Sequence, residues 1–178
     1  ILRSSGENIR GIYERNDVKI RELEGMAENK GWFMPETVED KNTVTEIVEN
    51  GIRYSVDVEN GQKTGFFLDQ KYNRQAVARI AKGKHVLDCF THTGAFALNA
   101  AAGGAASVTA VDVSAEAVRM TGINAEKNGF KDVVKPLEAN VFDLLTKLAE
   151  EKSHAYDFII LDPPAFTKSG STVKNAIR

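Results

Sequence analysis

The sequence has little of the chemistry on which secreted, metal-binding and membrane-spanning proteins depend. Its 178 residues include one cysteine, three histidines and four prolines. A single cysteine excludes an internal disulfide, and the histidines show none of the spacings of a zinc site. No apolar run approaches the roughly 18 residues that a spanning helix needs, and no signal-peptide core opens the chain. We therefore expect a cytoplasmic protein with no metal and no membrane partner.

An excess of charge of one sign is also missing. The chain has 23 Lys and Arg against 25 Asp and Glu, a net charge of -2, which does not by itself indicate a nucleic-acid partner. The distribution is uneven, because residues 1–60 carry a local charge of -5 and residues 61–90 a local charge of +4. Residues 165–178 contain three bases and no acid. An anionic ligand is expected at the two basic stretches, although solvated helix faces give the same pattern.

The first third of the chain predicts a small α+β domain, which we place at residues 1–62. A short strand over residues 9–13 precedes a short helix, for which Asp17 is a candidate N-cap and Gly25 a candidate end. The sequence begins without Met, so we expect a piece of a longer protein.

Residues 43–58 have the pattern of a β-hairpin. Asn50-Gly51 suits a type I′ turn, because both central positions of that turn need positive φ. On the return arm, apolar and polar residues alternate, so one face should be buried. The apolar positions of that arm are Ile52, Tyr54, Val56 and Val58.

From about residue 85 the pattern changes to short strands that alternate with helices. Such alternation implies right-handed crossovers and a parallel, doubly wound sheet, here over residues 63–178. Four strands are about half of such a sheet, so we expect its C-terminal strands to be missing. The expected strands are 85–90, 107–112, 133–139 and 156–161, and the expected helices are 94–102, 114–128 and 142–151.

A ligand of an open α/β sheet binds beyond the carboxyl ends of the strands. The loop after the first strand has only Gly94, whereas a pyrophosphate-binding loop needs G-x-G-x-x-G. S-adenosylmethionine has a carboxylate and an ammonium group but no phosphate. Its binding therefore does not require a loop with three glycines. Asp112 at the end of the second strand would then accept hydrogen bonds from both ribose hydroxyls.

The fourth strand ends in Asp162-Pro163-Pro164, and prolines cannot continue a central strand. We expect Asp162 and the Pro163 carbonyl to face the sulfonium end of the cofactor. The carboxylate could there accept a hydrogen bond from the exocyclic amine of a base. The alternative is a strand end with an incidental aspartate.

These motifs resemble those of a known family. The run LDCFTHTGAFA at 87–97, with Asp112, Asn140 and LDPPAFTK at 161–168, is similar to class I S-adenosylmethionine-dependent methyltransferases with a Rossmann-like fold. The run GQKTGFFLDQKYNR at 61–74 resembles, within that class, the family of large-subunit ribosomal RNA cytosine-5 methyltransferases. Residues 12–25 resemble the family's central domain, which suggests that residues 1–62 face RNA.

The resemblance implies parts that these 178 residues lack. Relatives carry an N-terminal PUA RNA-binding domain and, in a later Thr-Cys-Ser-type motif, a catalytic cysteine. The isolated chain is therefore expected to be inactive, and ribosomal RNA to be the partner of the whole enzyme; homodimerisation is left open. His92 stands where some members of the superfamily have glycine.

The resemblance and the strand ends together give a set of candidate cofactor contacts. In relatives the segment matching residues 67–74 lies beside the cofactor. The candidates are Phe67, Gln70, Arg74, Asp88, Phe90, Thr91, Thr93, Gly94, Asp112, Val113, Asn140, Val141, Asp162 and Pro163.

The chemistry implied by the resemblance is covalent, since a thiolate adds to carbon 6 of cytosine before carbon 5 takes the methyl group. Asp162 would position the flipped base, while Lys71, Arg74, Arg79 and residues 168–178 would contact phosphates. We expect Cys89 to be a packed core thiol, because strand alternation points it away from the side shared by Asp88 and Phe90.

The sequence is also compatible with two other functions. Asp-Pro-Pro followed by an aromatic residue is typical of methyltransferases that act on exocyclic amines of adenine or guanine, although Ala165 separates Phe166 from the prolines here. The third candidate is a non-catalytic RNA-binding module that keeps the fold.

Overall fold

The computed structural model describes residue 6 and residues 9–62 and 64–164. The chain divides into two compact units. The N-terminal unit comprises Ile1–Ile47 and Ser55–Leu68, and the sheet unit comprises Val48–Tyr54 and Asp69–Arg178. The tip of a hairpin therefore belongs to the sheet unit, although the chain before and after it belongs to the N-terminal unit.

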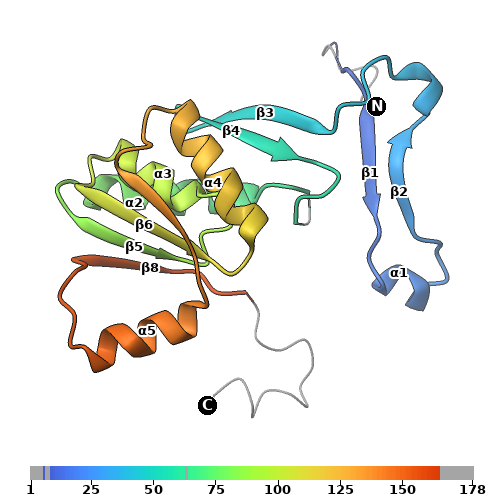
Figure 1. Ribbon diagram of the computed structural model, residues 1–178. Coiled ribbons are helices and arrows are strands. Elements are labelled where there is room, and N and C mark those ends of the chain that lie inside the picture. The colour runs from blue at the N-terminus through green and yellow to red at the C-terminus, as the bar shows by residue number, and fades with distance from the viewer. Residues whose placement is uncertain (1–5, 7–8, 63, 165–178) are drawn as a thin grey trace. The chain divides into compact units, whose positions relative to one another are not determined.

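The N-terminal unit contains an antiparallel strand pair, β1 (Ile12–Asn16) with β2 (Asn29–Phe33) (Figure 1). The short helix α1 (Ile20–Leu23) lies between them in the chain, and the 3₁₀ turn η2 (Pro35–Thr37) follows. β1 begins three residues later than predicted. β2 was not predicted, because its sequence, NKGWF, has a central glycine and no alternation of apolar and polar residues.

The predicted cap of α1 is wrong. The N-cap residue is Lys19, which makes no side-chain hydrogen bond to the helix. The Asp17 carboxylate instead accepts a hydrogen bond from Arg15 Nε at 3.1 Å. The guanidinium carries a full positive charge, whereas a helix amide carries only a partial one, so the ion pair takes the carboxylate. The predicted end of the helix at Gly25 is consistent with its φ of 70°.

The predicted hairpin is confirmed as β3 (Val44–Glu49) and β4 (Ile52–Asp57). The two turn residues, Asn50 and Gly51, have φ of 55° and 79°, as a turn with two left-handed residues requires. On β4 the buried positions are Ile52, Tyr54 and Val56.

The predicted doubly wound sheet is confirmed in the sheet unit. Its four strands are all parallel and lie in the order β7-β6-β5-β8. The chain goes from β5 outward through β6 to β7 and then returns to the other side of β5. The order thus reverses between β5 and its neighbours, and such a switch point forms a ligand-binding crevice in α/β sheets. The strands are β5 (His85–Cys89), β6 (Ser107–Asp112), β7 (Val134–Glu138) and β8 (Phe158–Leu161).

Helices cover both faces of this sheet (Figure 1). One face packs under α3 and α4, with α2 beside α3, and the other packs under α5. Successive strand residues alternate between the two cores, as Val86 and Leu87 do on β5. The helices are α2 (Lys71–Ile80), preceded by the 3₁₀ turn η3 (Leu68–Gln70), α3 (Ala95–Ala102), α4 (Ala115–Lys127) and α5 (Val141–Glu150).

Two helix starts follow from their caps. Ser114 Oγ accepts a hydrogen bond from the Ala117 amide at 3.3 Å, and this confirms the predicted cap of α4. Asn140 Oδ1 accepts one from the Phe142 amide at 2.9 Å and caps α5. α2 was not predicted, because its sequence is mostly polar and its buried side chains include Arg74.

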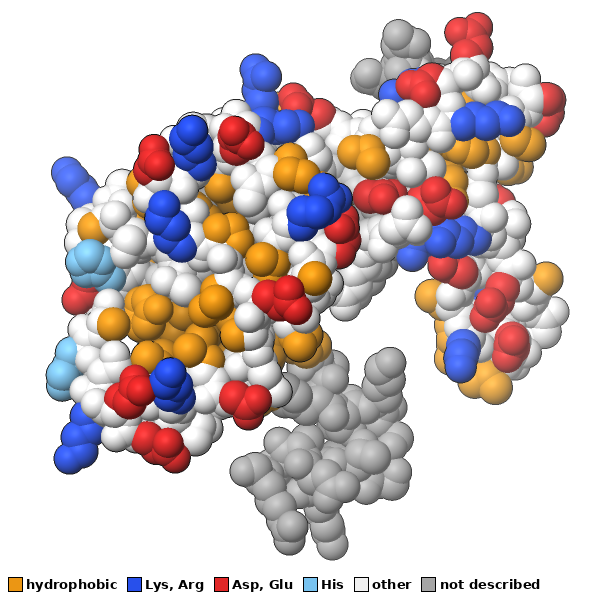
Figure 2. Space-filling model, in the orientation of Figure 1, with side chains coloured by type: hydrophobic (Ala, Val, Ile, Leu, Met, Phe, Trp, Pro, Cys, Tyr) orange, Lys and Arg blue, Asp and Glu red, His pale blue; other side chains and the backbone are white. Residues whose placement is uncertain are grey.

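The outer strand β8 presents an apolar edge in the described part of the chain. Figure 2 shows hydrophobic side chains gathered between β8 and α5, and Ile159 and Leu161 are 50% and 59% exposed. None of the helices formed by the described residues is both long and apolar enough to cross a bilayer.

Candidate functional site

The strand register brings the predicted ligand residues to one edge of the sheet. Cys89 is paired with Val111 on one side and with Leu161 on the other. The residues that follow these three positions, Phe90, Asp112 and Asp162, therefore emerge together at the carboxyl ends of β5, β6 and β8.

The loop after β5 contains three residues in the left-handed conformation. Phe90, His92 and Gly94 have φ of 60°, 53° and 83°. A Cβ at Gly94 would lie 2.7 Å from Thr121 Cγ2 and 2.8 Å from Leu98 Cδ1, so only glycine fits there. The Thr93 carbonyl accepts a hydrogen bond from Asn124 Nδ2 at 3.0 Å. Side chains of α4 thus fix the loop at the start of α3.

Asp88 lies fully buried at the base of this loop. Its Oδ2 accepts hydrogen bonds from Thr91 Oγ1 at 2.6 Å and from the Ala97 amide at 3.0 Å. Among the described residues, its Oδ1 is a buried side-chain oxygen without a hydrogen-bond partner. Burial raises the pKa of Asp88 to about 7, and the nearby charges of Asp162 and Asp112 add to the rise. Such an oxygen is suited to a cationic ligand group.

Asp112 is oriented by backbone amides from two loops. Its Oδ2 accepts from the His92 amide at 2.9 Å, and its Oδ1 accepts from the Ser114 amide at 3.0 Å. Each carboxylate oxygen keeps a second lone pair for a ligand hydroxyl. Val113, the next residue, is 72% exposed and offers an apolar surface beside that carboxylate. Burial lowers the pKa of His92, so its imidazole is neutral at pH near 7.

The remaining candidates at the strand ends differ in exposure. Asp162 and Asn140 are exposed, and Pro163 is half-buried. The Val141 side chain, by contrast, is 3% exposed and packs in the core under α5. Residues 165–178, with Ala165, Phe166 and the predicted phosphate contacts of the last eleven residues, lie outside the described residues.

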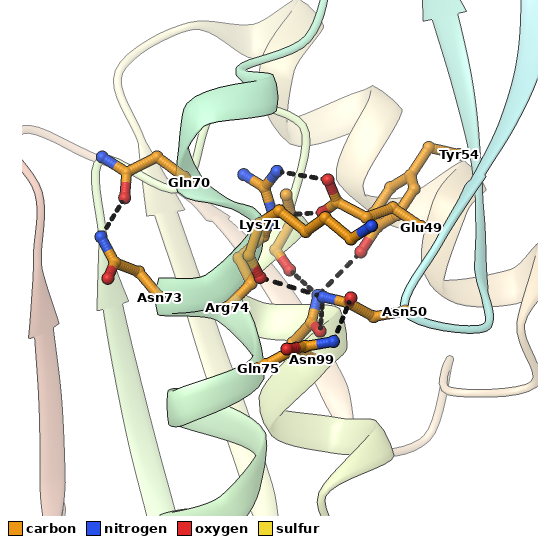
Figure 3. A network of polar contacts seen from close by, with 10 residues as sticks. Glu49, Asn50, Tyr54, Gln70, Lys71, Asn73, Arg74, Gln75 and Asn99 are labelled. Carbon is orange, nitrogen blue, oxygen red and sulfur yellow. Dashed lines mark hydrogen bonds and ion pairs between the residues drawn. The ribbon is translucent and has the colours of Figure 1, made fainter.

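The candidates between residues 67 and 74 have other surroundings. Phe67 belongs to the N-terminal unit, and Gln70 Oε1 accepts a hydrogen bond from Asn73 Nδ2 at 2.6 Å. Arg74 is 2% exposed, and its Nε and Nη2 lie 2.7 and 3.0 Å from the two carboxylate oxygens of Glu49 (Figure 3). This bidentate ion pair joins α2 to the hairpin tip.

Sequence reasoning missed the polar network that surrounds this ion pair. Asn50 Oδ1 accepts from Gln75 Nε2 at 2.9 Å, and Asn50 Nδ2 donates to the Lys71 carbonyl and to Asn99 Oδ1, both at 3.2 Å. Asn99 Nδ2 donates to the Tyr54 hydroxyl at 2.9 Å (Figure 3). In the sequence, Asn50 predicted only a turn. Nothing in the sequence indicated that its side-chain amide would form hydrogen bonds with α2 and α3.

Cys89 is fully buried with Leu87, Val111 and Val141 on the face covered by α5. It is therefore on the opposite face from Asp88, as predicted. Phe90 does not share the side of Asp88, because its left-handed φ takes it out of the strand alternation and its ring packs on the Cys89 cluster. Burial raises the pKa of the Cys89 thiol to about 11, and the charge of Asp88 adds to this. A thiol that is so rarely ionised is a poor nucleophile.

Cys89→Ser is accordingly expected to leave cofactor affinity within about threefold of the parent chain. It should cost about 1–3 kcal/mol of stability, because it buries a hydroxyl in an apolar cluster. Isothermal calorimetry with S-adenosylmethionine and thermal unfolding check the two effects. Complete loss of binding in a folded variant would contradict the assignment of Cys89 to the core.

The fold and the strand-end carboxylates together define a class of cofactor-dependent transferases, and the comparisons with known proteins agree. The chain belongs to the family described as S-adenosylmethionine-dependent methyltransferase, whose model matches residues 27–178. The predicted Rossmann-like fold and S-adenosylmethionine cofactor are thereby confirmed. Among the described residues, no three His, Cys, Asp or Glu side chains gather as metal ligands.

Individual relatives support the same class. Ribosomal RNA large subunit methyltransferase I of Aeromonas salmonicida is 43% identical over 169 residues, which are 94% of this chain and 41% of that protein. The crystal structure of SMU.776 complexed with SAH has a TM-score of 0.68 and 32% identity, covering 79% of this chain and 36% of that one. A candidate SAM-dependent methyltransferase from Streptococcus mutans has a TM-score of 0.74 and 29% identity. The match covers 94% of this chain and 43% of that one. The chain thus spans less than half the length of these relatives.

Proposed function

We propose that this chain forms part of a cytoplasmic RNA methyltransferase that modifies carbon 5 of a cytosine in large-subunit ribosomal RNA. The observation that carries the proposal is the convergence of Asp88, Asp112 and Asp162 at the ends of adjacent strands. The similarity to ribosomal RNA large subunit methyltransferase I supports the substrate class. In this proposal residues 1–62 face RNA and residues 63–178 hold the cofactor.

The described residues fit the charged and polar groups of S-adenosylmethionine, which supplies the methyl group from its sulfonium. The unpartnered Oδ1 of Asp88 would accept a hydrogen bond from the cofactor ammonium. The two oxygens of Asp112 would accept from the ribose hydroxyls. Phe67, Gln70, Arg74 and Val141 stay predictions, since none of their described contacts points to a ligand. The other proposed contacts are Phe90, Thr91, Thr93, Gly94, Val113, Asn140, Asp162 and Pro163.

Asp112→Ala tests this placement. Charge-assisted hydrogen bonds contribute roughly 1.5–3 kcal/mol each, so the variant should bind S-adenosylmethionine at least about tenfold more weakly. Calorimetry on the 178-residue chain measures the affinity. Unchanged affinity would remove Asp112 from the cofactor site, and thermal unfolding shows whether the variant keeps its fold.

Cytosine-5 chemistry needs a thiolate, and Cys89 is the only cysteine in the 178 residues. Because Cys89 is buried on the α5 face, we propose that the nucleophile lies in sequence that follows residue 178. Asp162, exposed beyond β8, would hold the edge of the flipped cytosine through its amine.

The 178-residue chain should therefore bind cofactor but transfer no methyl group. A radiolabelled transfer assay on unmodified ribosomal RNA should give background signal. Turnover comparable to that of a longer protein would contradict a nucleophile outside this chain.

An exocyclic-amine methyltransferase is the second candidate, and the exposed Asp162 before two prolines favours it. Mass spectrometry of ribosomal RNA nucleosides from a deletion strain separates the two. Loss of 5-methylcytidine supports the proposal, and loss of an N-methylated purine supports the second candidate.

A further inference from the structure

The N-terminal unit contains a cleft that the cofactor site does not use. Its volume is about 490 Å³, within the range of small-molecule sites. All of its lining residues belong to the N-terminal unit, so it is formed without any strand end of the sheet. The lining includes Arg10, Tyr13, Arg15, Trp32, Asn42 and Thr45.

One wall of the cleft is aromatic. The Tyr13 and Trp32 rings meet edge to face, with centroids 5.2 Å apart and planes at 85°. A Cβ at Gly11 would lie 2.8 Å from Trp32 Cζ3 and 3.1 Å from Val38 Cγ2. The indole therefore lies directly against the backbone beside β1, which holds the ring in place.

Apart from Gly11 and Val58, the rest of the lining is polar and contains no acidic residue, although residues 1–60 carry a net charge of -5. The nearby Glu59 carboxylate accepts a hydrogen bond from Thr43 Oγ1 of the lining at 3.5 Å. The Asn42 amide and the Thr45 hydroxyl each offer both a donor and an acceptor. Such groups can read the edge of an uncharged polar ring but give little attraction to a multiply charged ligand.

The two arginines of the cleft, Arg10 and Arg15, differ in how firmly their side chains are held. Arg15 is fixed, because Nε donates to Asp17 at 3.1 Å and Nη1 donates to the Val58 and Gly61 carbonyls at 2.9 Å each. Arg10 is 50% exposed, and its contacts to Asp40 Oδ2 and to the Asn42 carbonyl are both 3.3 Å long. Arg10 can thus turn toward an anionic group at the cleft mouth, whereas Arg15 presents a rigid planar surface.

We propose that this cleft binds an unpaired nucleotide of the RNA, in addition to the one that is methylated. The base would stack on Trp32, its edge would meet Asn42 and Thr45, and its phosphate would lie beside Arg10. Bases splayed out of single strands are recognised in this way, by stacking and by hydrogen bonds to their edges. The inference rests on the proposed RNA substrate.

Trp32 makes the test direct, because it is the only tryptophan in the chain. We expect a short single-stranded oligoribonucleotide to quench its fluorescence saturably, after correction for absorption by the RNA. Arg10→Ala and Thr45→Val should each weaken the apparent affinity at least about fivefold, and duplex RNA should quench less. As a control, Arg119→Ala replaces an exposed arginine of the sheet unit and should leave the affinity for the oligoribonucleotide within about twofold of the parent chain.

Absence of saturable quenching overturns the proposal, and so does an affinity of both cleft variants that equals the affinity of the parent chain. Equal quenching by heparin also overturns it, since that would show a site for any polyanion. If Arg10→Ala is unfolded by circular dichroism, Thr45→Val decides alone. Calorimetry with S-adenosylmethionine on the same sample distinguishes failure of the cleft proposal from failure of the proposed function. Cofactor binding without quenching refutes only nucleotide binding in the cleft. Quenching without cofactor binding refutes only the proposed methyltransferase function.

Discussion

Replacing Glu49 with alanine is expected to lower the free energy of unfolding by about 3–5 kcal/mol, because it leaves the Arg74 guanidinium buried without its partner. Both side chains are nearly inaccessible, at 2% for Arg74 and 7% for Glu49, and they form two parallel hydrogen bonds. The pair joins the hairpin tip to α2, so its loss should also loosen the tip. Urea unfolding measures the first effect, and hydrogen exchange of the Ile52 and Tyr54 amides measures the second.

The chain contains a matched control for this ion pair. Arg119 and Glu116 form an equally short pair, at 2.6 Å, but their side chains are 58% and 67% exposed. Glu116→Ala should cost at most about 0.5 kcal/mol, since exposed ion pairs contribute little. If Glu49→Ala and Glu116→Ala were equally mild, burial would not govern the Glu49–Arg74 pair. The double variant Glu49→Leu with Arg74→Met should recover much of the lost stability.

Asp88→Asn is expected to stabilise the cofactor-free chain and to weaken cofactor binding. Burial raises the pKa of Asp88 from 3.8 to about 7. Between these values the folded state binds more protons than the unfolded state, so the stability of the parent chain falls as the pH rises toward 7. A shift of this size corresponds to at most about 4 kcal/mol. The variant should therefore unfold at a higher temperature than the parent at about pH 8, and the gap should shrink toward about pH 4.

The control for the Asp88 prediction is Asp132→Asn, which changes an exposed aspartate before β7. That substitution should alter stability by less than about 0.5 kcal/mol at either pH. The amide at position 88 cannot offer a negative charge to an ammonium group, so cofactor affinity should fall in the same variant that gains stability. A gap between Asp88→Asn and the parent that does not change with pH would contradict the burial of an ionisable carboxyl at this position.

The regular alternation of strands and helices made most of the sheet unit predictable. The strands other than β7, whose sequence is VKPLE, contain short apolar runs. Each helix between the strands begins or ends at a recognisable residue, as α4 does at Ser114. The positions of Asp112 and Asp162 followed, because the carboxyl ends of parallel strands share one edge. The N-terminal unit was less predictable. β2 has no alternating pattern, and the Asp17 carboxylate could either cap α1 or accept a hydrogen bond from Arg15, as it does.

What the sequence by itself determined is the parallel sheet, the hairpin turn and the order of the polar strand ends, because all of these depend on local patterns and on residues that permit a given φ. Only the tertiary structure decided which polar side chains are buried. Arg74 is a candidate ligand residue in the sequence, and only the structure shows its buried ion pair with Glu49, 25 residues earlier in the chain. Asp88 shows the same dependence, since its raised pKa comes from burial and from two carboxylates at the ends of neighbouring strands. Burial and charge proximity depend on residues distant in sequence, and no local pattern records them.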